Sequence, residues 1–375
     1  YCSSMIKPMR IVCFLSIFLL SACGGSGSSG TDVSLPETFI TISTNQNAQL
    51  VTKTVTLTWS SVGADNCTAS GDWEGDKGLS GSEEVEVIKV GTNLFTLICQ
   101  AQSYHHKEAN VRVEGYITEN KTIQQTVGNI SANREFYIRY PQNPVENQYP
   151  LVFIFHGAGG NGEQEMNRHA EILNLIDEGK FIGIFPTGFE NRWNVSGETN
   201  ADDVEFFDLM ITELNNSSIF DTNNTYAIGI SNGAGIINKI AKEKDLLKGI
   251  APLISQQSEP VGEIVPGIPL SVYQVNGEND DLVPIEGGSG VAGTIFMSAK
   301  ASAENWAINF NCSMTPNEEE IYWGSFEVAE FTYADCLNGV EVKYFVVKDS
   351  GHNIQFENQI DLFNQIWEFF IRTAN

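Results

Sequence analysis

The chain has 375 residues, which is long enough for one or two globular domains with a large buried core. Its 47 acidic and 21 basic residues give a formal net charge of -26. So acidic a surface repels the phosphate backbone of nucleic acids and anionic membranes, and we therefore expect no nucleic-acid partner and an uncharged or cationic ligand. The more ordinary explanation is that acidity keeps an exported protein soluble.

The first 22 residues are typical of a bacterial export signal. Lys7 and Arg10 form a positively charged start, and the apolar run 11–20 follows. A run of ten residues is too short to span a bilayer, which takes about 20 apolar residues. The run ends in Leu-Ser-Ala-Cys, which resembles the lipobox of bacterial lipoproteins, whose cysteine is acylated and becomes the new N-terminus. The sequence predicts a lipoprotein signal over 1–22 and lipidation at Cys23, and an ordinary cleaved signal is the alternative.

A flexible tether rich in Gly and Ser is expected over 23–36. Because Gly24 rather than Asp follows the cysteine, the resemblance implies an exported outer-membrane lipoprotein, at the cell surface or in the periplasm. The outer membrane is then one partner of the chain.

Four cysteines remain beyond Cys23, and their number is even, as expected for disulfides in an oxidising compartment. Three pairings are possible. We expect Cys67 to pair with Cys99 and Cys312 to pair with Cys336, because each pair then lies within one predicted domain. Free buried thiols are the alternative.

Residues 37–115 have the pattern of a small all-β domain. Val55, Leu57 and Trp59 alternate with Ser and Thr, as in a strand with one buried face. Gly and Asn turns separate further strand-like segments, which are 83–90, 93–100 and 110–115.

The stretch VTLTWSSVGADNCTASGDWEG resembles the immunoglobulin-like modules of bacterial exported proteins. The regularly spaced short strands, with Trp59 available to pack near a bridge between Cys67 and Cys99, themselves predict a small β-sandwich. We expect the module to act as a spacer, and polymer binding through Trp73 is the alternative.

After Tyr116 the pattern becomes that of an α/β protein. Apolar runs of strand length alternate with helical stretches, which predicts a mostly parallel sheet covered by helices on both faces. The expected strands are 151–155, 182–185, 226–230, 249–253, 270–275 and 342–347, and the expected helices are 163–179, 201–215, 234–244, 298–310 and 358–372.

The pentapeptide Gly-Ile-Ser-Asn-Gly at 229–233 stands between the strand-like TYAIGI and the helix-like AGIINKIAKE. This is the context of a nucleophile elbow. Glycines beside the serine allow a tight turn that exposes a strained nucleophile at the sheet edge. The sequence therefore predicts Ser231 as a nucleophile, with a glycine-rich helix start as the alternative.

A nucleophilic serine needs a base and an acid, which in such folds follow it in the order acid, then His. His352 is the only histidine after Ser231, and an imidazole can both take up and return a proton near neutral pH. The acid should follow the strand 270–275. Spacing alone does not choose among its four candidates, which are Glu278, Asp280, Asp281 and Glu286.

An oxyanion hole requires two backbone amides that face the developing negative charge. One is expected from Asn232, the residue after the nucleophile. The other is expected from Ala158 in the glycine-rich loop FHGAGGN, where His156 would anchor the loop. We further expect Trp193 to line the acyl or aryl pocket, with packing in the core as the alternative.

With these motifs in place, residues 120–375 resemble the polyhydroxybutyrate depolymerase and feruloyl esterase superfamily of bacterial exported esterases, which has the α/β-hydrolase fold. The motifs are FHGAGGN, RWN followed by DDVEFFDLMI, YAIGISNGAG, NGENDDLVP, the Asn311-Cys312 pair and the Gly351-His352 pair. The resemblance implies a triad of Ser231, Asp280 and His352. The family's acid loop usually reads HGT-x-D-P-x-VP, whereas this chain has Asn276 for the His and Asp281 for the Pro. The RWN segment is more similar to the feruloyl esterase branch.

The sequence thus predicts a secreted, lipid-anchored serine esterase that works through an acyl-enzyme, without a metal or an organic cofactor. The resemblance implies a polymeric or polymer-derived ester substrate, either feruloyl or acetyl esters of plant polysaccharide or short polyesters such as polyhydroxybutyrate. Two alternatives are a surface polymer-binding lipoprotein with an inactive hydrolase domain and a serine peptidase on the same fold. No feature of the sequence specifies an oligomeric state.

Overall fold

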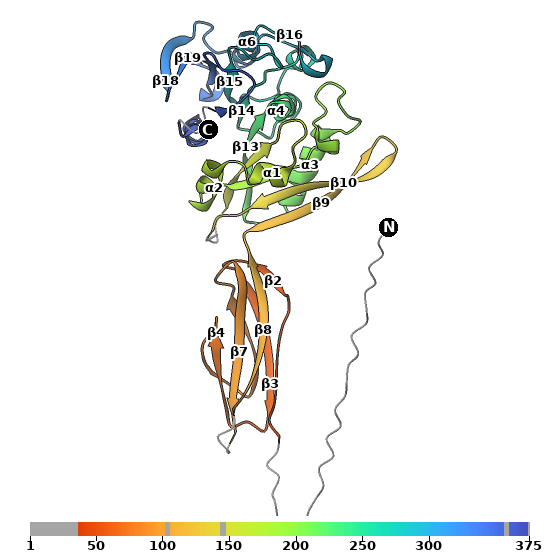
Figure 1. The fold of residues 1–375 in the computed structure, drawn as a ribbon, viewed down its shortest axis with the longest axis vertical. Helices are drawn as coiled ribbons and strands as arrows, with labels where there is room; N and C mark the ends of the chain where they lie inside the picture. The colour runs from red at the N-terminus through yellow and green to blue at the C-terminus, as the bar shows by residue number, and fades with distance from the viewer. Residues whose placement is uncertain (1–36, 102–105, 143–147, 356–359, 374–375) are drawn as a thin grey trace, which may run out of the picture.

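The computed structural model describes residues 37–101, 106–142, 148–355 and 360–373. The predicted signal 1–22, the predicted lipidation site Cys23 and the tether 23–36 lie outside these ranges. In Figure 1 the described chain forms a strand-only module followed by a larger body of strands and helices. No helix within the described ranges has both the length and the apolarity that crossing a membrane requires.

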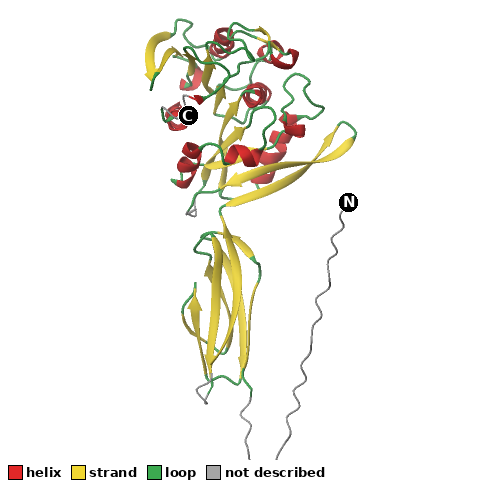
Figure 2. Cartoon of the chain, viewed as in Figure 1, coloured by secondary structure: helices red, strands yellow, loops and turns green. Residues whose placement is uncertain are grey.

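The strand-only module consists of two sheets (Figure 2). The first has the order β1-β3-β6, formed by β1 (Phe39–Thr44), β3 (Thr54–Val62) and β6 (Ser80–Glu86). The second has the order β2-β8-β7-β4-β5, formed by β2 (Ala48–Leu50), β8 (His106–Tyr116), β7 (Gly91–Gln100), β4 (Asn66–Gly71) and β5 (Gly75–Lys77). The prediction of an all-β module is therefore confirmed, whereas its immunoglobulin-like character stays a prediction.

The core of this module forms as the strand pattern predicts. Trp59 of β3 is buried in one cluster with the two cysteines of the first disulfide. The disulfide joins Cys67 and Cys99, which lie directly opposite each other on the neighbouring strands β4 and β7. Trp73 is 6% exposed, and its indole N–H donates to the carbonyl oxygen of Thr96 at 2.9 Å. Trp73 is thus a core residue, and the alternative of polymer binding through its ring is wrong.

The second body is built on a ten-stranded sheet with the order β18-β19-β20-β15-β14-β13-β11-β12-β10-β9. Its six central strands run parallel to one another. They are β12 (Ile182–Pro186), β11 (Tyr149–Phe155), β13 (Phe220–Ile230), β14 (Gly249–Leu253), β15 (Ser271–Gly277) and β20 (Val342–Val347). Antiparallel hairpins extend both edges, formed by β9 (Thr118–Val127) with β10 (Ile130–Arg139) and by β18 (Asn317–Trp323) with β19 (Phe326–Tyr333). A separate small hairpin pairs β16 (Gly288–Ser289) with β17 (Ile295–Phe296).

The sheet carries helices on both faces, as predicted. One buried cluster packs the sheet against α3 (Asp203–Leu214), α4 (Asn232–Glu243) and α6 (Ala299–Asn309). The cluster on the other face includes α2 (Ala170–Asp177) and α7 (Leu362–Thr373). The remaining short helices are α1 (Gly162–Met166), α5 (Glu259–Gly262), η1 (Phe189–Asn191), η2 (Val291–Gly293) and η3 (Leu337–Gly339). The strands and helices together form an α/β-hydrolase fold.

The structure corrects one predicted helix. The single helix expected over 163–179 is split into α1 and α2, because His169 has an extended backbone (φ -110°, ψ 100°) at the start of α2. The second predicted disulfide, Cys312 with Cys336, is present and ties the end of α6 to the loop after β19. Both predicted cysteine pairings are therefore confirmed.

Candidate active site

Ser231 lies in the sharp turn between β13 and α4. Its backbone has φ 56° and ψ -116°, a conformation that is strained for a residue with a side chain. A Cβ atom at Gly229 would lie 2.2 Å from the carbonyl oxygen of Gly233, and one at Gly233 would lie 2.2 Å from the carbonyl oxygen of Phe155. Neither position can carry a side chain without moving the backbone, which is the physical reason for the Gly-x-Ser-x-Gly pattern.

A line of hydrogen bonds joins Ser231 to a histidine and an acid from two other loops. Ser231 Oγ is 2.7 Å from Nε2 of His352, in the loop after β20. His352 Nδ1 is 2.7 Å from Oδ2 of Asp280, in the loop after β15. Because a carboxylate can only accept, Nδ1 carries the proton and Nε2 is left to accept from the serine hydroxyl.

Asp280 is fixed independently of the histidine. Its Oδ1 accepts hydrogen bonds from the amides of Leu282 at 3.0 Å and Val283 at 2.8 Å, and the residue is 6% exposed. The carboxylate therefore holds the His352 ring in one orientation and one tautomer.

Of the four candidate acids, Asp280 is the one hydrogen bonded to the histidine. Glu278 turns away, pairs with Lys348 at 3.2 Å and accepts from the amide of Asp349 at 3.2 Å. The hydrogen bond from Asp349, helped by Lys348, lowers the pKa of Glu278. Asp281 is exposed. The geometry thus agrees with the acid that the family resemblance implied.

The two predicted oxyanion donors come from the start of α4 and from the loop after β11. Asn232 is the first residue of α4, where an amide has no acceptor within its own helix. The loop after β11 reaches the serine through Gly157, where a Cβ atom would lie 3.6 Å from the Ser231 Cβ. No described residue accepts a hydrogen bond from the amide of Asn232 or of Ala158. Both N–H groups are therefore free to meet a negative oxygen.

His156 anchors this loop. It is fully buried, its Nδ1–H donates to the carbonyl oxygen of Gly157 at 2.7 Å, and its Nε2 accepts from the amide of Gly188 at 3.0 Å. Burial lowers the pKa of the imidazole. A neutral ring with both nitrogens engaged is a structural anchor rather than a second base.

Trp193 does not line a pocket, so that prediction is wrong. The side chain is 0% exposed and packs edge-on against Phe155, with 5.0 Å between the ring centroids. Its indole N–H donates to the carbonyl oxygen of His156 at 2.9 Å. The ring lies under the loop after β11, and its surface is fully occupied by protein.

Asn276, which stands where the family that the motifs resemble usually has a histidine, belongs to a buried network of side-chain amides. Its Nδ2 donates to Oε1 of Gln256 at 2.9 Å, and its Oδ1 accepts from Gln274 at 3.0 Å. Gln256 in turn donates to the carbonyl oxygens of Pro284 and Met297. The amide network therefore ties the loop after β14 to the acid loop.

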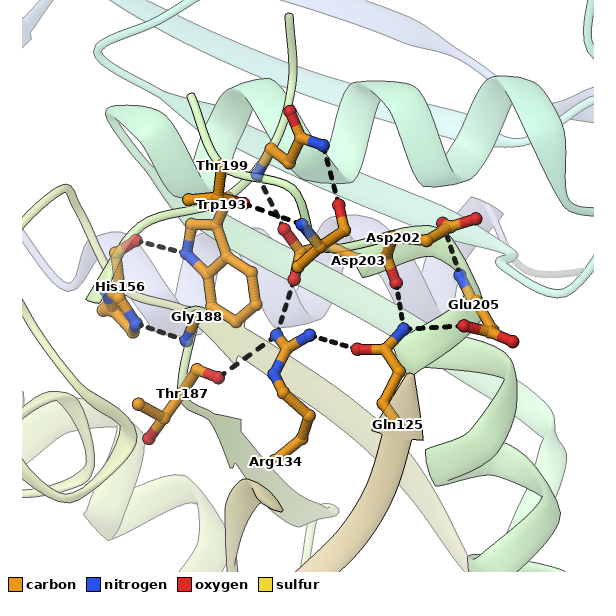
Figure 3. Close-up of polar contacts among 12 residues, drawn as sticks. Gln125, Arg134, His156, Thr187, Gly188, Trp193, Thr199, Asp202, Asp203 and Glu205 are labelled. Atoms are coloured by element: carbon orange, nitrogen blue, oxygen red, sulfur yellow. Dashed lines mark hydrogen bonds and ion pairs between the residues drawn. The ribbon is translucent and has the colours of Figure 1, made fainter. Parts of the chain in front are cut away.

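The structure contains a buried ion pair near the site that the sequence did not predict. Arg134 of β10 donates to Oδ1 of Asp203 at 2.5 Å, and both side chains are at most 1% exposed (Figure 3). Burial raises the pKa of the Asp203 carboxyl and lowers that of the Arg134 guanidinium, while their attraction opposes both effects. The sequence shows the Asp pair in DDVEFFDLMI. Nothing in that segment indicates that one of these acids pairs with an arginine in a strand hairpin.

The described residues contain no group of three or more His, Cys, Asp or Glu side chains arranged to hold a metal ion.

No protein-family model matches the chain. The protein named "Putative esterase NocK" of Nocardia uniformis subsp. tsuyamanensis is 30% identical over 145 residues, which cover 37% of this chain and 42% of that protein. Feruloyl esterase B of Piromyces equi is 25% identical over 234 residues, covering 58% and 42%. The "Probable feruloyl esterase C" of Aspergillus niger is 25% identical over 268 residues, covering 68% and 89%.

The chain thus spans less than half the length of the first two relatives and most of the third. The resemblance that the motifs indicate is confirmed at the level of the superfamily: the described residues from Thr118 onward have the α/β-hydrolase fold, and the chain is related in sequence to feruloyl esterases.

Proposed function

We propose that the chain is a carboxylic ester hydrolase that forms an acyl-enzyme on Ser231. The observation that carries this proposal is the hydrogen-bonded line from Ser231 Oγ through the ring of His352 to the buried carboxylate of Asp280, with 2.7 Å at each step. Such a line supplies a nucleophile, a base and an orienting acid.

In this mechanism Ser231 Oγ attacks the carbonyl carbon of the ester while His352 Nε2 takes the hydroxyl proton. The carbonyl oxygen becomes an oxyanion, which the amides of Ala158 and Asn232 stabilise, and each such donor is typically worth about 3 kcal/mol. The ester bond then breaks, and His352 returns the proton to the leaving oxygen. Water repeats the sequence, with His352 as its base, and releases the acid and the free serine.

The substrate class follows from the relatives and the charge. Because the related proteins include feruloyl esterases, we propose feruloyl or acetyl esters of plant polysaccharide, ahead of short polyesters such as polyhydroxybutyrate. A net charge of -26 favours such neutral esters over polyanionic substrates.

We also propose an export and domain scheme for the whole chain. A lipoprotein signal over 1–22 leads to a lipidated Cys23 in the outer membrane, a tether over 23–36, an immunoglobulin-like spacer over 37–115 and a catalytic domain over 120–375. The two disulfides support export to an oxidising compartment. Labelling cells with an alkyne-bearing palmitate tests the anchor: wild type should take up the label, and labelled Cys23→Ala protein would contradict it.

The activity is tested by hydrolysis of methyl ferulate, nitrophenyl acetate and a hydroxybutyrate oligomer by the purified chain. We expect Ser231→Ala to abolish turnover and Ser43→Ala, on an exposed face of β1, to leave it unchanged. Ester hydrolysis that survives in Ser231→Ala would refute the proposal. Absence of turnover in folded wild type would favour a polymer-binding protein, and serine-dependent cleavage of amides but not esters would favour a peptidase.

A further inference from the structure

Trp193 touches both segments that supply the proposed oxyanion donors. On one side its indole N–H reaches the carbonyl oxygen of His156, two residues before Ala158 (Figure 3). On the other side its main chain is paired with the side chain of Asn232: the Trp193 amide donates to Oδ1 at 2.7 Å, and Nδ2 donates to the Trp193 carbonyl oxygen at 3.1 Å. Three hydrogen bonds from one residue therefore span the loop after β11 and the start of α4.

The residue that forms these bonds is itself held rigidly. The amide of Asn194, the next residue, donates to Oδ2 of Asp203 at 2.6 Å, and its side chain donates to the carbonyl oxygen of Ala201 at 2.7 Å. The other oxygen of Asp203 is bound by Arg134, which also contacts Gln125 of β9 (Figure 3). The buried ion pair thus fixes the main chain of the Trp193 segment to the β9–β10 hairpin.

We infer that Trp193 is a positioning residue for the oxyanion hole, holding the amides of Ala158 and Asn232 at one separation and one orientation. This inference rests on the proposed function, since it assigns a role within the same site. Trp193 touches no reacting atom and acts through His156 and Asn232. The ion pair of Arg134 and Asp203 serves as the fixed support for its segment.

The physical argument concerns alignment. A backbone amide stabilises an oxyanion only when its N–H lies about 2.7 to 3.1 Å from the oxygen. Without the indole N–H, the buried carbonyl of His156 loses its partner and the loop can shift to find another. A displacement of about 1 Å in a catalytic group can reduce turnover about a hundredfold.

The test compares Trp193→Phe with wild type in the full chain, using nitrophenyl acetate. Phenylalanine keeps an aromatic ring in the core and removes the indole donor. We expect kcat to fall by roughly ten- to a hundredfold, with KM within about twofold of wild type, because the lost alignment acts on the transition state. The inhibition constant of phenylboronic acid, whose tetrahedral serine adduct mimics that state, should rise by about the same factor as kcat falls.

Trp306→Phe is the matched control. Trp306 is equally buried in the same core cluster, and its indole N–H donates to Oδ1 of Asn238 at 3.1 Å, on helix α4 beyond the elbow. We expect this variant to lose thermal stability while its kcat and its boronate affinity stay at the wild-type values. A fall in kcat equal to that of Trp193→Phe would show a general packing effect and overturn the inference.

Asn232→Ala provides a second variant in case Trp193→Phe does not fold. It removes both side-chain bonds to Trp193 and keeps the backbone amide, at a partly exposed position. We expect the same selective fall in kcat and boronate affinity, and values at the wild-type level would overturn the inference. Wild type without Ser231-dependent hydrolysis would refute the proposed function itself, whereas active wild type with unaffected variants would refute only the positioning role.

Discussion

Replacing Asp280 by Asn is the sharpest test of the hydrogen-bonded line. The asparagine side chain can still accept from the amides of Leu282 and Val283 through Oδ1, so the loop should keep its shape. At the position of Oδ2, however, an NH₂ group would face Nδ1 of His352. Since both atoms would then be donors, His352 must move its proton to Nε2, which points at Ser231 Oγ.

A histidine in that tautomer cannot accept the serine proton. Loss of the tautomer in a triad of this kind reduces kcat by about 10⁴, which corresponds to about 5.4 kcal/mol of transition-state stabilisation. The free energy of unfolding should change by only about 1 to 2 kcal/mol, because a charge-assisted hydrogen bond to the ring is exchanged for a neutral one and the bonds from the two loop amides are kept.

The assay is the steady-state hydrolysis of nitrophenyl acetate, with urea unfolding measured on the same preparations. Asp281→Asn is the matched control, since it makes the same chemical change one residue away on an exposed side chain. We expect its kcat to equal that of wild type. Full activity in Asp280→Asn, or an equal loss in Asp281→Asn, would refute the assignment of the acid.

Three further predictions concern stability. Arg134→Met leaves the Asp203 carboxylate buried without its partner, and the free energy of unfolding in urea should fall by about 3 to 5 kcal/mol; a change below about 1 kcal/mol would contradict the role of the pair. Burial lowers the pKa of Lys242 from 10.5 to about 7, so between about pH 7 and 10 the unfolded chain binds a proton that the folded chain does not. Unfolding free energy should therefore rise with pH in this window by up to about 1.4 kcal/mol per pH unit, and parallel pH curves for wild type and Lys242→Met would contradict it. Replacing both Cys312 and Cys336, 24 residues apart, by alanine should lower the unfolding free energy by about 3 kcal/mol with kcat unchanged, and equal urea midpoints would contradict this.

Features that local sequence determines were predicted well. The elbow is local, because Gly229 and Gly233 are required by contacts within a few residues of Ser231 and by the adjacent strand end. The central strands are continuous apolar runs, and β14 (Gly249–Leu253) has the predicted bounds. His352 needed no pattern, since it was the only downstream histidine.

Features that depend on distant contacts were not predicted. Trp193 is hydrogen bonded to His156 and Asn232, which lie 37 and 39 positions away from it in the sequence. No local sequence pattern predicts these bonds or the burial that accompanies them. The partner of Arg134 is 69 residues away in the sequence, in helix α3. The edge hairpins β9–β10 and β18–β19 were missed because their outer faces are polar, which weakens the apolar signal on which the central strands were recognised.

The choice of Asp280 over its acidic neighbours was only partly predictable from the sequence. Spacing left four candidates, and the family resemblance pointed to one. The physical reason for that choice appears only in three dimensions, where Lys348 holds Glu278 away from the histidine and two loop amides hold Asp280 toward it.

The positive φ of Ser231 also bears on how such a chain would evolve. A glycine would adopt that backbone without strain, so the serine costs the fold about 1 to 3 kcal/mol relative to a residue without a side chain. Selection for stability alone would therefore replace it. A descendant freed from its substrate should drift toward glycine at this position, which makes a retained serine a sign of continuing chemical use.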